Sequence, residues 1–276
     1  MTARKSRESA RIPKNRFVES VLTAVAIAIT CVAAIPAAGQ NSTPSAAYKA
    51  PRAMDGHADI EGIWQVRNTS AAFDLQDHAA ARGIPPGRGI IVDPPDGKIP
   101  YKQEALAKRA GNFQNRETAD TLNKCYMPGV PRLTYLNFPL QIFQTPKYTL
   151  IAYEYIHIYR TIFTDGTKHI QGLDFWNGDS RGHWEGDTLV VDVSDFNDQT
   201  WFDASGDYHS GALHVVERYT RTGQDTLQYE ATIEDPNVFT RPWTIRIPLY
   251  RHAEPGFRLL EYECHAYSDE EAKARK

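Results

Sequence analysis

The sequence predicts a mainly β protein, an antiparallel meander forming a barrel or sandwich, with one N-terminal helix and Pro/Gly-rich loops. The 276 residues include 17 prolines and 18 glycines, and 11% are aromatic, a composition that favours strands and turns. From residue 138 onward, short alternating apolar segments follow one another with polar turns between them. Gly186-Asp187 separates two of these segments, and both residues tolerate the backbone angles of a tight hairpin.

Residues 1–39 predict a secretory signal peptide. Basic residues up to Arg16 precede an uncharged apolar run over residues 21–35, and small residues follow it before Gln40. An apolar run of this length is short for a membrane span, which needs roughly 20 residues. An uncleaved anchor is the alternative. We therefore expect an exported protein, periplasmic or extracellular.

The charge balance argues against two classes of partner. The formal net charge is −3, and it becomes −7 when residues 1–39 are removed, because six basic and two acidic residues leave with them. A mildly acidic chain without a basic stripe is a poor match for nucleic acid or for an anionic membrane surface. We expect no nucleic-acid partner and, after signal cleavage, no membrane partner.

The remaining chain divides into three parts. Residues 40–58, rich in Ser, Ala, Pro and Gly, predict a flexible linker, residues 59–267 a single β-rich domain, and residues 268–276 a charged tail. The expected helix is residues 101–113, with Ala105, Leu106, Ala110 and Phe113 on its apolar side. The expected strands are residues 59–66, 90–92, 140–144, 149–155, 156–163, the two arms of the 186–187 hairpin, 213–221, 226–234, 243–250 and 257–262.

The cysteines predict a disulfide. Cys31 lies within the signal peptide, so Cys125 and Cys264 are the pair left in the exported chain. An even pair in an oxidising compartment favours a disulfide, here between the Pro-rich segment before the sheet and the last strand. Two separate buried thiols are the alternative.

One candidate binding surface follows from alternation within residues 149–163. Side chains of a strand point alternately to its two faces, which places Tyr153, Tyr155, His157 and Tyr159 together. An aromatic face with a few polar groups suits a small-molecule pocket. A tyrosine-rich outer face is the alternative. Trp184, Trp201 and Tyr219 are further candidate ligand-binding residues, with core packing as the alternative for the tryptophans.

The candidate catalytic residues centre on residues 209–221. Glu217 shares a face with apolar neighbours, and burial of a carboxyl raises its pKa toward that of a general acid. A structural salt bridge to Arg160 or Arg246 is the alternative that we favour. His209 lies on the preceding loop and is the candidate base, oriented by Glu217 or Asp203. Arg160 or Arg218 would stabilise developing negative charge.

The same segment does not favour a metal. His209 and His214 precede Glu217 at spacings that invite a metal hypothesis, but His214 and Glu217 face opposite sides of the expected strand. We expect neither a metal nor an organic cofactor.

Several strings resemble an uncharacterised family of exported bacterial proteins. The distinctive string is Trp184-Glu185-Gly186-Asp187-Thr188-Leu189-Val190-Val191, and Cys125-x-x-Pro128-Gly129-Val130-Pro131-Arg132, His209-Ser210 and Pro242-Trp243-Thr244 extend the likeness. The resemblance implies export and a single domain, and it assigns no catalytic residues. The expected strand number and aromatic interior are also similar to those of lipocalin-type barrels, which is an analogy of fold alone.

These observations lead to a functional hypothesis with alternatives. The first is a cofactor-independent acid–base enzyme, a lyase, isomerase or hydratase, acting on a small apolar or aromatic compound. The second is a non-catalytic ligand-binding or carrier protein that uses the same pocket. The third is a structural module of the cell envelope in which the charged residues only support the fold.

Overall fold

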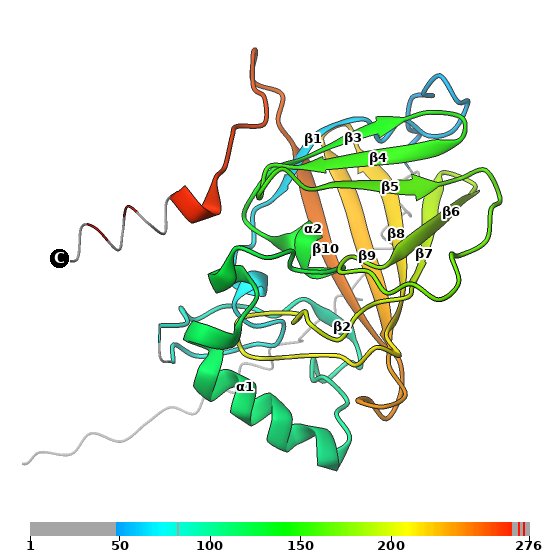
Figure 1. Ribbon diagram of the computed structural model, residues 1–276. Coiled ribbons are helices and arrows are strands. Elements are labelled where there is room, and N and C mark those ends of the chain that lie inside the picture. The colour runs from blue at the N-terminus through cyan, green and yellow to red at the C-terminus, as the bar shows by residue number, and fades with distance from the viewer. Residues whose placement is uncertain (1–47, 82, 267–269, 271–272, 274–276) are drawn as a thin grey trace, which may run out of the picture. The chain divides into compact units, whose positions relative to one another are not determined.

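The computed structural model describes residues 48–81, 83–266, 270 and 273. The predicted signal peptide, linker residues 40–47 and most of the charged tail lie outside the described residues. The described residues belong to one compact unit. This unit is mainly β, which confirms the predicted fold class (Figure 1).

Nine of the described strands form a closed barrel, so the barrel alternative is the correct one. Their order is β1-β3-β4-β5-β6-β7-β8-β9-β10, and β10 pairs back onto β1. Closure pairs the two edges that an open sheet would expose. The strands of the chain are β1 (Gly62–Val66), β2 (Ile91–Asp93), β3 (Leu140–Gln144), β4 (Tyr148–Tyr153), β5 (Tyr159–Phe163), β6 (Asp179–Glu185), β7 (Thr188–Ser194), β8 (His214–Gly223), β9 (Thr226–Glu234) and β10 (Trp243–Arg251).

The pairing departs from a simple meander at two places. β5 and β6 run parallel, with Phe163 opposite Arg181, because the connection between them is long enough to return the chain to the same end of the barrel. β2 pairs with the start of β10, at Thr244 and Ile245, while the end of β10 pairs with β1. The remaining neighbours in the barrel are antiparallel.

The barrel interior is filled with side chains. Buried and more exposed positions alternate along β8, β9 and β10, as the sequence predicts. Burial of these apolar side chains is the main stabilising contribution to the fold. Large interior side chains include Trp64, Tyr219, Tyr229, Trp243, Ile245 and Leu249.

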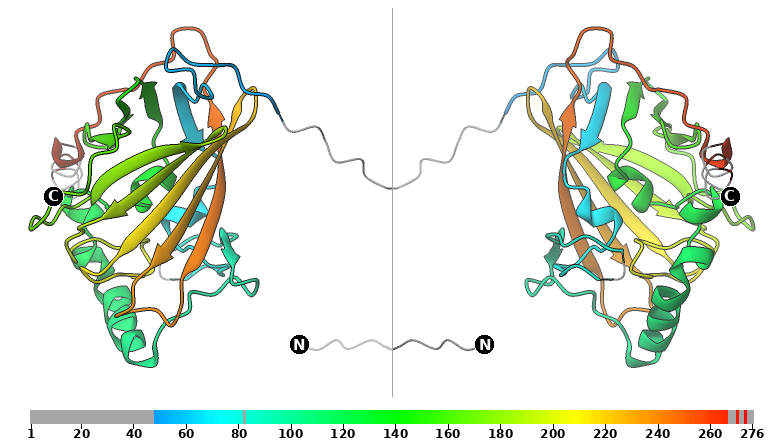
Figure 2. Two further views of the ribbon diagram at one scale, coloured as in Figure 1. Left: turned by 90° about the vertical axis from the view of Figure 1, so that its right-hand side faces the viewer. Right: turned by 90° about the vertical axis from the view of Figure 1, so that its left-hand side faces the viewer.

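The helices gather toward one end of the barrel, where α1 (Leu106–Ala119) lies beyond the strands (Figures 1 and 2). The shorter elements are α2 (Arg132–Tyr135) and the 3-10 turns η1 (Ser70–Ala72), η2 (Gln103–Ala105) and η3 (Leu122–Lys124). Among the described residues, no helix is both long and apolar enough to cross a membrane.

The predicted helix is present, but the prediction of which side chains it buries is wrong. It was expected over residues 101–113, and α1 instead continues to Ala119. Ala105 and Arg116 are buried, whereas Leu106 and Ala110 are exposed. The reason is that α1 packs against the polar loop before β8, where Asn112 donates a hydrogen bond to the Gly206 carbonyl at 3.1 Å.

Two further expectations about strands are wrong. Residues 154–158 form a turn between β4 and β5, with positive φ at Ile156 and His157, so alternation does not continue across it. Residues 257–262 form no strand, and one isolated bridge joins Tyr262 to Tyr155. The closed barrel explains the second difference, since both sides of β10 are already paired.

The described part of the predicted linker is packed against the domain. Ala50 and Ala58 are buried, and Arg52 lies 2.6 Å from Asp187 of the β6–β7 hairpin. Ala53 and His57 are joined by a backbone hydrogen bond of 3.0 Å. Ordered structure therefore begins before residue 59, the expected boundary.

Candidate functional site

The Arg160–Glu217 pair lies inside the barrel and is fully hydrogen bonded through its carboxylate. The Arg160 guanidinium donates to both oxygens of Glu217, at 3.1 Å from Nη1 to Oε1, and its Nε donates to Ser180 Oγ at 2.9 Å. Glu217 Oε1 also accepts from the hydroxyls of Tyr219 and Tyr229, at 3.1 and 2.8 Å. The favoured expectation of a salt bridge is confirmed, with Arg160 as the partner. Arg246 instead pairs with Glu230, 2.6 Å away.

This interior cluster is sealed. Glu217 is 0% exposed and Arg160 5%. Burial raises the pKa of Tyr219 and of Tyr229, and the negative charge of Glu217 raises it further. Both phenols therefore remain protonated and act as hydrogen-bond donors. The cluster holds one positive and one negative charge, and hydroxyl donors complete its hydrogen bonds. This composition is typical of an ion pair with a structural role.

The other two predicted catalytic residues lie elsewhere. His209 is 1% exposed; its Nδ1 donates to the Ser210 carbonyl at 2.9 Å, so Nε2 of the neutral ring accepts from Thr200 Oγ1 at 2.7 Å. Burial lowers the pKa of His209, which favours this neutral form. Arg218 is on the outer face of β8, where its Nη2 donates to Glu185 at 2.9 Å. Thus Arg160 and Glu217 are brought together, and His209 and Arg218 do not join them.

The four residues expected on one aromatic face are separated by the turn at residues 154–158. Tyr153 points into the barrel, and Tyr155 packs against Phe138 and Tyr262 on the turn. His157 lies 2.9 Å from Glu263 at the surface, and Tyr159 is 74% exposed. The prediction that these four residues share one face is wrong, because the backbone reverses direction at residues 154–158.

The remaining predicted ligand-binding residues also lie apart. Trp184 stacks on His57 with ring centroids 4.8 Å apart, beside a hollow of about 190 Å³. Trp201 is buried and forms a bridge with Tyr208. Tyr219 belongs to the interior cluster described above.

A larger cleft lies at the end of the barrel that carries the helices. Its volume is about 580 Å³, and it lies among η1, the end of α1, η3 and α2. Binding sites for small molecules commonly enclose roughly 300–1,000 Å³ and have mostly apolar walls. The apolar walls here include Ala72, Phe73, Ile84, Leu122, Leu136 and Phe138.

A second buried arginine–carboxylate pair borders this cleft. Arg132 donates from Nη1 and Nη2 to the two oxygens of Asp120, at 2.7 and 2.8 Å, and is 1% exposed. Its Nε is buried and has no hydrogen-bond partner among the described residues. Both residues line the cleft, and the unused Nε of Arg132 is buried beneath its wall.

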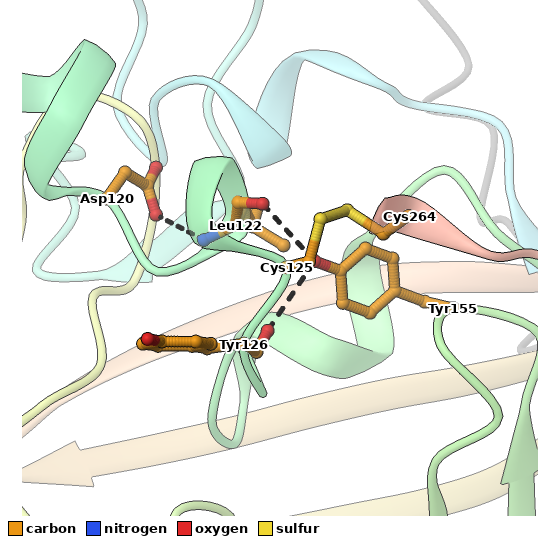
Figure 3. The surroundings of a disulfide bond; sticks show 6 residues. All are labelled: Asp120, Leu122, Cys125, Tyr126, Tyr155 and Cys264. Atoms are coloured by element: carbon orange, nitrogen blue, oxygen red, sulfur yellow. Dashed lines mark hydrogen bonds between the residues drawn. A yellow bond between two sulfur atoms is a disulfide. The ribbon is translucent and has the colours of Figure 1, made fainter. Parts of the chain in front are cut away.

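The predicted disulfide is confirmed and supports the cleft wall. Cys125 and Cys264 are bonded, with a Cα–Cα distance of 5.6 Å across 139 residues of sequence. Figure 3 shows the bond next to Leu122, whose carbonyl and that of Tyr126 accept hydrogen bonds from the Tyr155 hydroxyl. Asp120 accepts the N–H of Leu122 at 3.0 Å in the same picture. The disulfide therefore fixes the residue after η3, which forms one wall of the cleft, to the segment that contains Cys264.

A group of three aspartates lies next to the cleft. Carboxylate oxygens of Asp74, Asp203 and Asp207 all lie within 4.8 Å of one another. Burial raises the pKa of Asp74 and of Asp203, and the negative charge of Asp207 raises it further. Ala204, which follows Asp203, lines the cleft, so the two features share a loop.

Sequence reasoning missed the cleft and most of the residues around it. No protein-family model and no curated protein matches this chain. The resemblance to an exported bacterial family therefore stays a prediction. Two signals were present in the sequence. Arg132 is part of one of the strings that carry the resemblance, and residues 203–207 contain two aspartates. Neither pattern predicts which distant residues these segments contact.

Proposed function

We propose that this is an exported small-molecule-binding protein whose ligand occupies the barrel-end cleft. The observation that carries the proposal is the cleft of about 580 Å³ with mainly apolar walls and the unused donor of Arg132. Its size suits a small organic molecule. Its walls favour burial of apolar surface over recognition of a highly charged group.

The charges at the cleft narrow the chemistry of the ligand. Asp120 already neutralises Arg132 through two hydrogen bonds, so the pair brings no net charge to the site. The Nε–H of Arg132 still needs an acceptor. A neutral, mainly apolar molecule meets the first condition, and one carbonyl or hydroxyl oxygen on it would meet the second after a shift of the Arg132 side chain.

Export is part of the proposal. Disulfides persist in oxidising compartments and are rare in the cytosol, so the Cys125–Cys264 bond supports a periplasmic or extracellular location. The expected leader at residues 1–39 agrees with this location but lies outside the described residues.

The acid–base enzyme is the less favoured hypothesis. Glu217 has both oxygens engaged by Arg160, and His209 and Arg218 lie outside that cluster. A shared proton pathway needs its donor and acceptor within hydrogen-bond reach of one substrate. Binding therefore has the stronger support.

The first test is whether the cleft takes up a small molecule. Protein purified from an exporting host is examined by native mass spectrometry for a co-purifying compound, and the apolar dye 1-anilinonaphthalene-8-sulfonate is titrated by fluorescence. The blocking variants are Thr69→Trp and Glu117→Trp, at two exposed positions that line the cleft. Thr118→Trp, the next position on α1 and outside the cleft lining, is the matched control.

We expect each blocking variant to weaken dye binding at least about tenfold, a loss of roughly 1.4 kcal/mol. Thr118→Trp should leave it unchanged. Absence of dye binding, or equal binding in all four proteins, would overturn the proposal. Loss of the co-purified mass in the blocking variants would extend the result to the natural ligand.

A further inference from the structure

The three buried aspartates come from two loops that meet at the barrel end. Asp74 follows η1, while Asp203 and Asp207 lie on the loop between β7 and β8. Asp74 is 8% exposed, and the other two are 0% exposed. Gly206 permits the close approach of this loop to α1, since a Cβ there would lie 2.7 Å from Cβ of Asn112.

The negative charges in this cluster exceed the positive ones. Among the described residues, Arg109 of α1 is the cation in contact with it, with Nε 3.0 Å from Asp207 Oδ1 and Nη2 3.9 Å from Asp74 Oδ2. Tyr101 adds a neutral donor to Asp207 Oδ1 at 2.9 Å, and Ser205 another to Asp74 Oδ2 at 2.9 Å. Three carboxylates face one guanidinium. Buried charge of one sign requires compensation by a counter-charge or a proton.

One oxygen of the cluster has no hydrogen-bond partner. Asp207 Oδ2 is buried and accepts no N–H or O–H group of a described residue, and the carboxyl groups of Asp203 and Asp207 lie within hydrogen-bond reach of each other. Buried carboxylate oxygens are normally satisfied, so an unused one beside two other carboxylates indicates a missing cation or a shared proton. This observation is separate from the charge count, because it concerns the coordination of one atom.

Backbone N–H groups hold the carboxyl group of Asp203 in place. Its Oδ1 accepts the backbone N–H groups of Ser205 and Asp207, at 3.0 and 3.2 Å, and its Oδ2 accepts that of Leu75 at 3.0 Å. Several N–H donors favour the charged form of a carboxyl group. A proton shared between Asp203 and Asp207 would relieve the same repulsion and is the competing explanation.

We propose that Asp74, Asp203 and Asp207 bind a single hard divalent cation, Ca²⁺, that fixes the β7–β8 loop to η1 at the barrel end. The donors are all oxygens, which favour Ca²⁺, Mg²⁺ or Mn²⁺ over softer metals. Ca²⁺ accepts irregular loop ligands together with water, whereas Mg²⁺ demands near-ideal octahedral geometry. A hollow of about 120 Å³ reaches one of the three carboxylates: Asp74 lines it together with Arg109 and Ser205, whereas Asp203 and Asp207 lie behind its wall.

The site adjoins the barrel-end cleft without depending on it. Asp203 is the residue before Ala204 in the cleft wall, and the Ala204 N–H donates to the Ala72 carbonyl at 3.2 Å. A cation at the aspartates would hold this wall in place. The proposal stands on the carboxylates and is tested separately from ligand binding.

The test is Ca²⁺ binding to the full-length protein after EDTA treatment, measured by isothermal titration calorimetry, with thermal unfolding as a second readout. We expect one ion per chain with a Kd below about 1 mM, within the range of extracellular calcium modules. At Ca²⁺ about 100 times Kd, the unfolding midpoint should rise by about 5 °C or more. No heat and no shift up to about 10 mM Ca²⁺ would overturn the proposal.

Two variants separate the cation from the shared proton. Asp207→Asn removes a ligand with little change in shape, and Asp198→Asn, at an exposed position of the same loop, is the control. For a cation site, Asp207→Asn weakens Ca²⁺ binding at least about tenfold, while Asp198→Asn binds as the wild type does. For a shared proton, Asp207→Asn raises the unfolding midpoint equally with Ca²⁺ and with EDTA, and this result would overturn the proposal.

A measurement on the wild-type protein protects the test against a variant that does not fold. Tb³⁺ occupies Ca²⁺ sites and is sensitised by a nearby phenol, and the Tyr101 hydroxyl already contacts Asp207. We expect tyrosine-sensitised Tb³⁺ emission that Ca²⁺ displaces. Emission that Ca²⁺ does not displace, or no emission, counts against the site.

Discussion

The two buried arginine–carboxylate pairs have the same chemistry in different surroundings. Arg160–Glu217 lies inside the barrel, where Ser180, Tyr219 and Tyr229 complete its hydrogen bonds. Arg132–Asp120 lies at the barrel end, where Arg132 keeps an unused Nε beside a cleft. The comparison teaches that burial of an ion pair does not by itself indicate a binding site. The better indication is a hydrogen-bonding group that the surrounding residues leave unsatisfied.

The charge balance of the two regions differs in the same way. Inside the barrel one arginine meets one glutamate. Among the described residues at the barrel end, three arginines lie beside five carboxylates: Arg109, Arg116 and Arg132 beside Asp74, Glu117, Asp120, Asp203 and Asp207. The balanced region supports the fold, and the unbalanced one is where an added ion or ligand gains most.

The largest expected effect is on the sealed pair. Glu217→Gln leaves the Arg160 charge buried without its partner, and we expect it to lower the free energy of unfolding by about 3–5 kcal/mol. Urea unfolding followed by tryptophan fluorescence measures the change. The double variant Arg160→Met/Glu217→Met is the control and should lose much less, since no charge is left unpaired. A loss below about 1 kcal/mol for the single variant would show that the barrel interior is hydrated.

The second-largest effect is expected from removal of the disulfide, which should change both the stability of the fold and the cleft. Cys125→Ala/Cys264→Ala releases a loop spanning 139 residues, and we expect a loss of about 2–4 kcal/mol in the free energy of unfolding. Because η3 forms a wall of the cleft, dye binding should weaken as well, while the interior pair is unaffected. Urea unfolding and dye titration, with and without dithiothreitol, measure both changes. Unchanged dye affinity in the reduced protein would mean that the wall is held by packing alone.

The third effect is on the open pair. Asp120→Asn leaves the Arg132 charge beside the cleft, where entering water reduces the penalty, so we expect a loss of about 1–3 kcal/mol. The anionic dye should then bind several-fold more tightly, because its sulfonate replaces the missing carboxylate. Glu217→Gln is the matched comparison and should not change dye affinity. Equal dye affinity in both variants would place Arg132 out of reach of the ligand.

The smallest effect is on the surface. Arg218 pairs with Glu185 on the outer face of β8, where solvent screens the interaction. We expect Arg218→Ala to leave both the unfolding midpoint and dye binding unchanged within error. A clear loss of dye binding would restore Arg218 to the functional residues predicted from the sequence.

Local patterns determined much of the barrel in advance. Alternation along residues 213–221 placed Glu217 and Tyr219 on the inner face, and Gly186-Asp187 marked the β6–β7 hairpin. These predictions held because side-chain direction in a strand depends on neighbours in sequence. The prediction failed at residues 154–158 because two residues with positive φ reverse the chain, and their side chains gave no sign of it.

By itself, the sequence determined the β class, the hairpins, the inward face of β8 and the pairing of Cys125 with Cys264. Tertiary structure decided that the sheet closes, because the contact of β1 with β10 joins segments far apart in the chain. It also decided the cleft and the aspartate cluster, since Leu75 and Asp203 meet across 128 residues. The physical reason is that alternation and turns are local, whereas the meeting of loops at the barrel end depends on the closure of the whole ring.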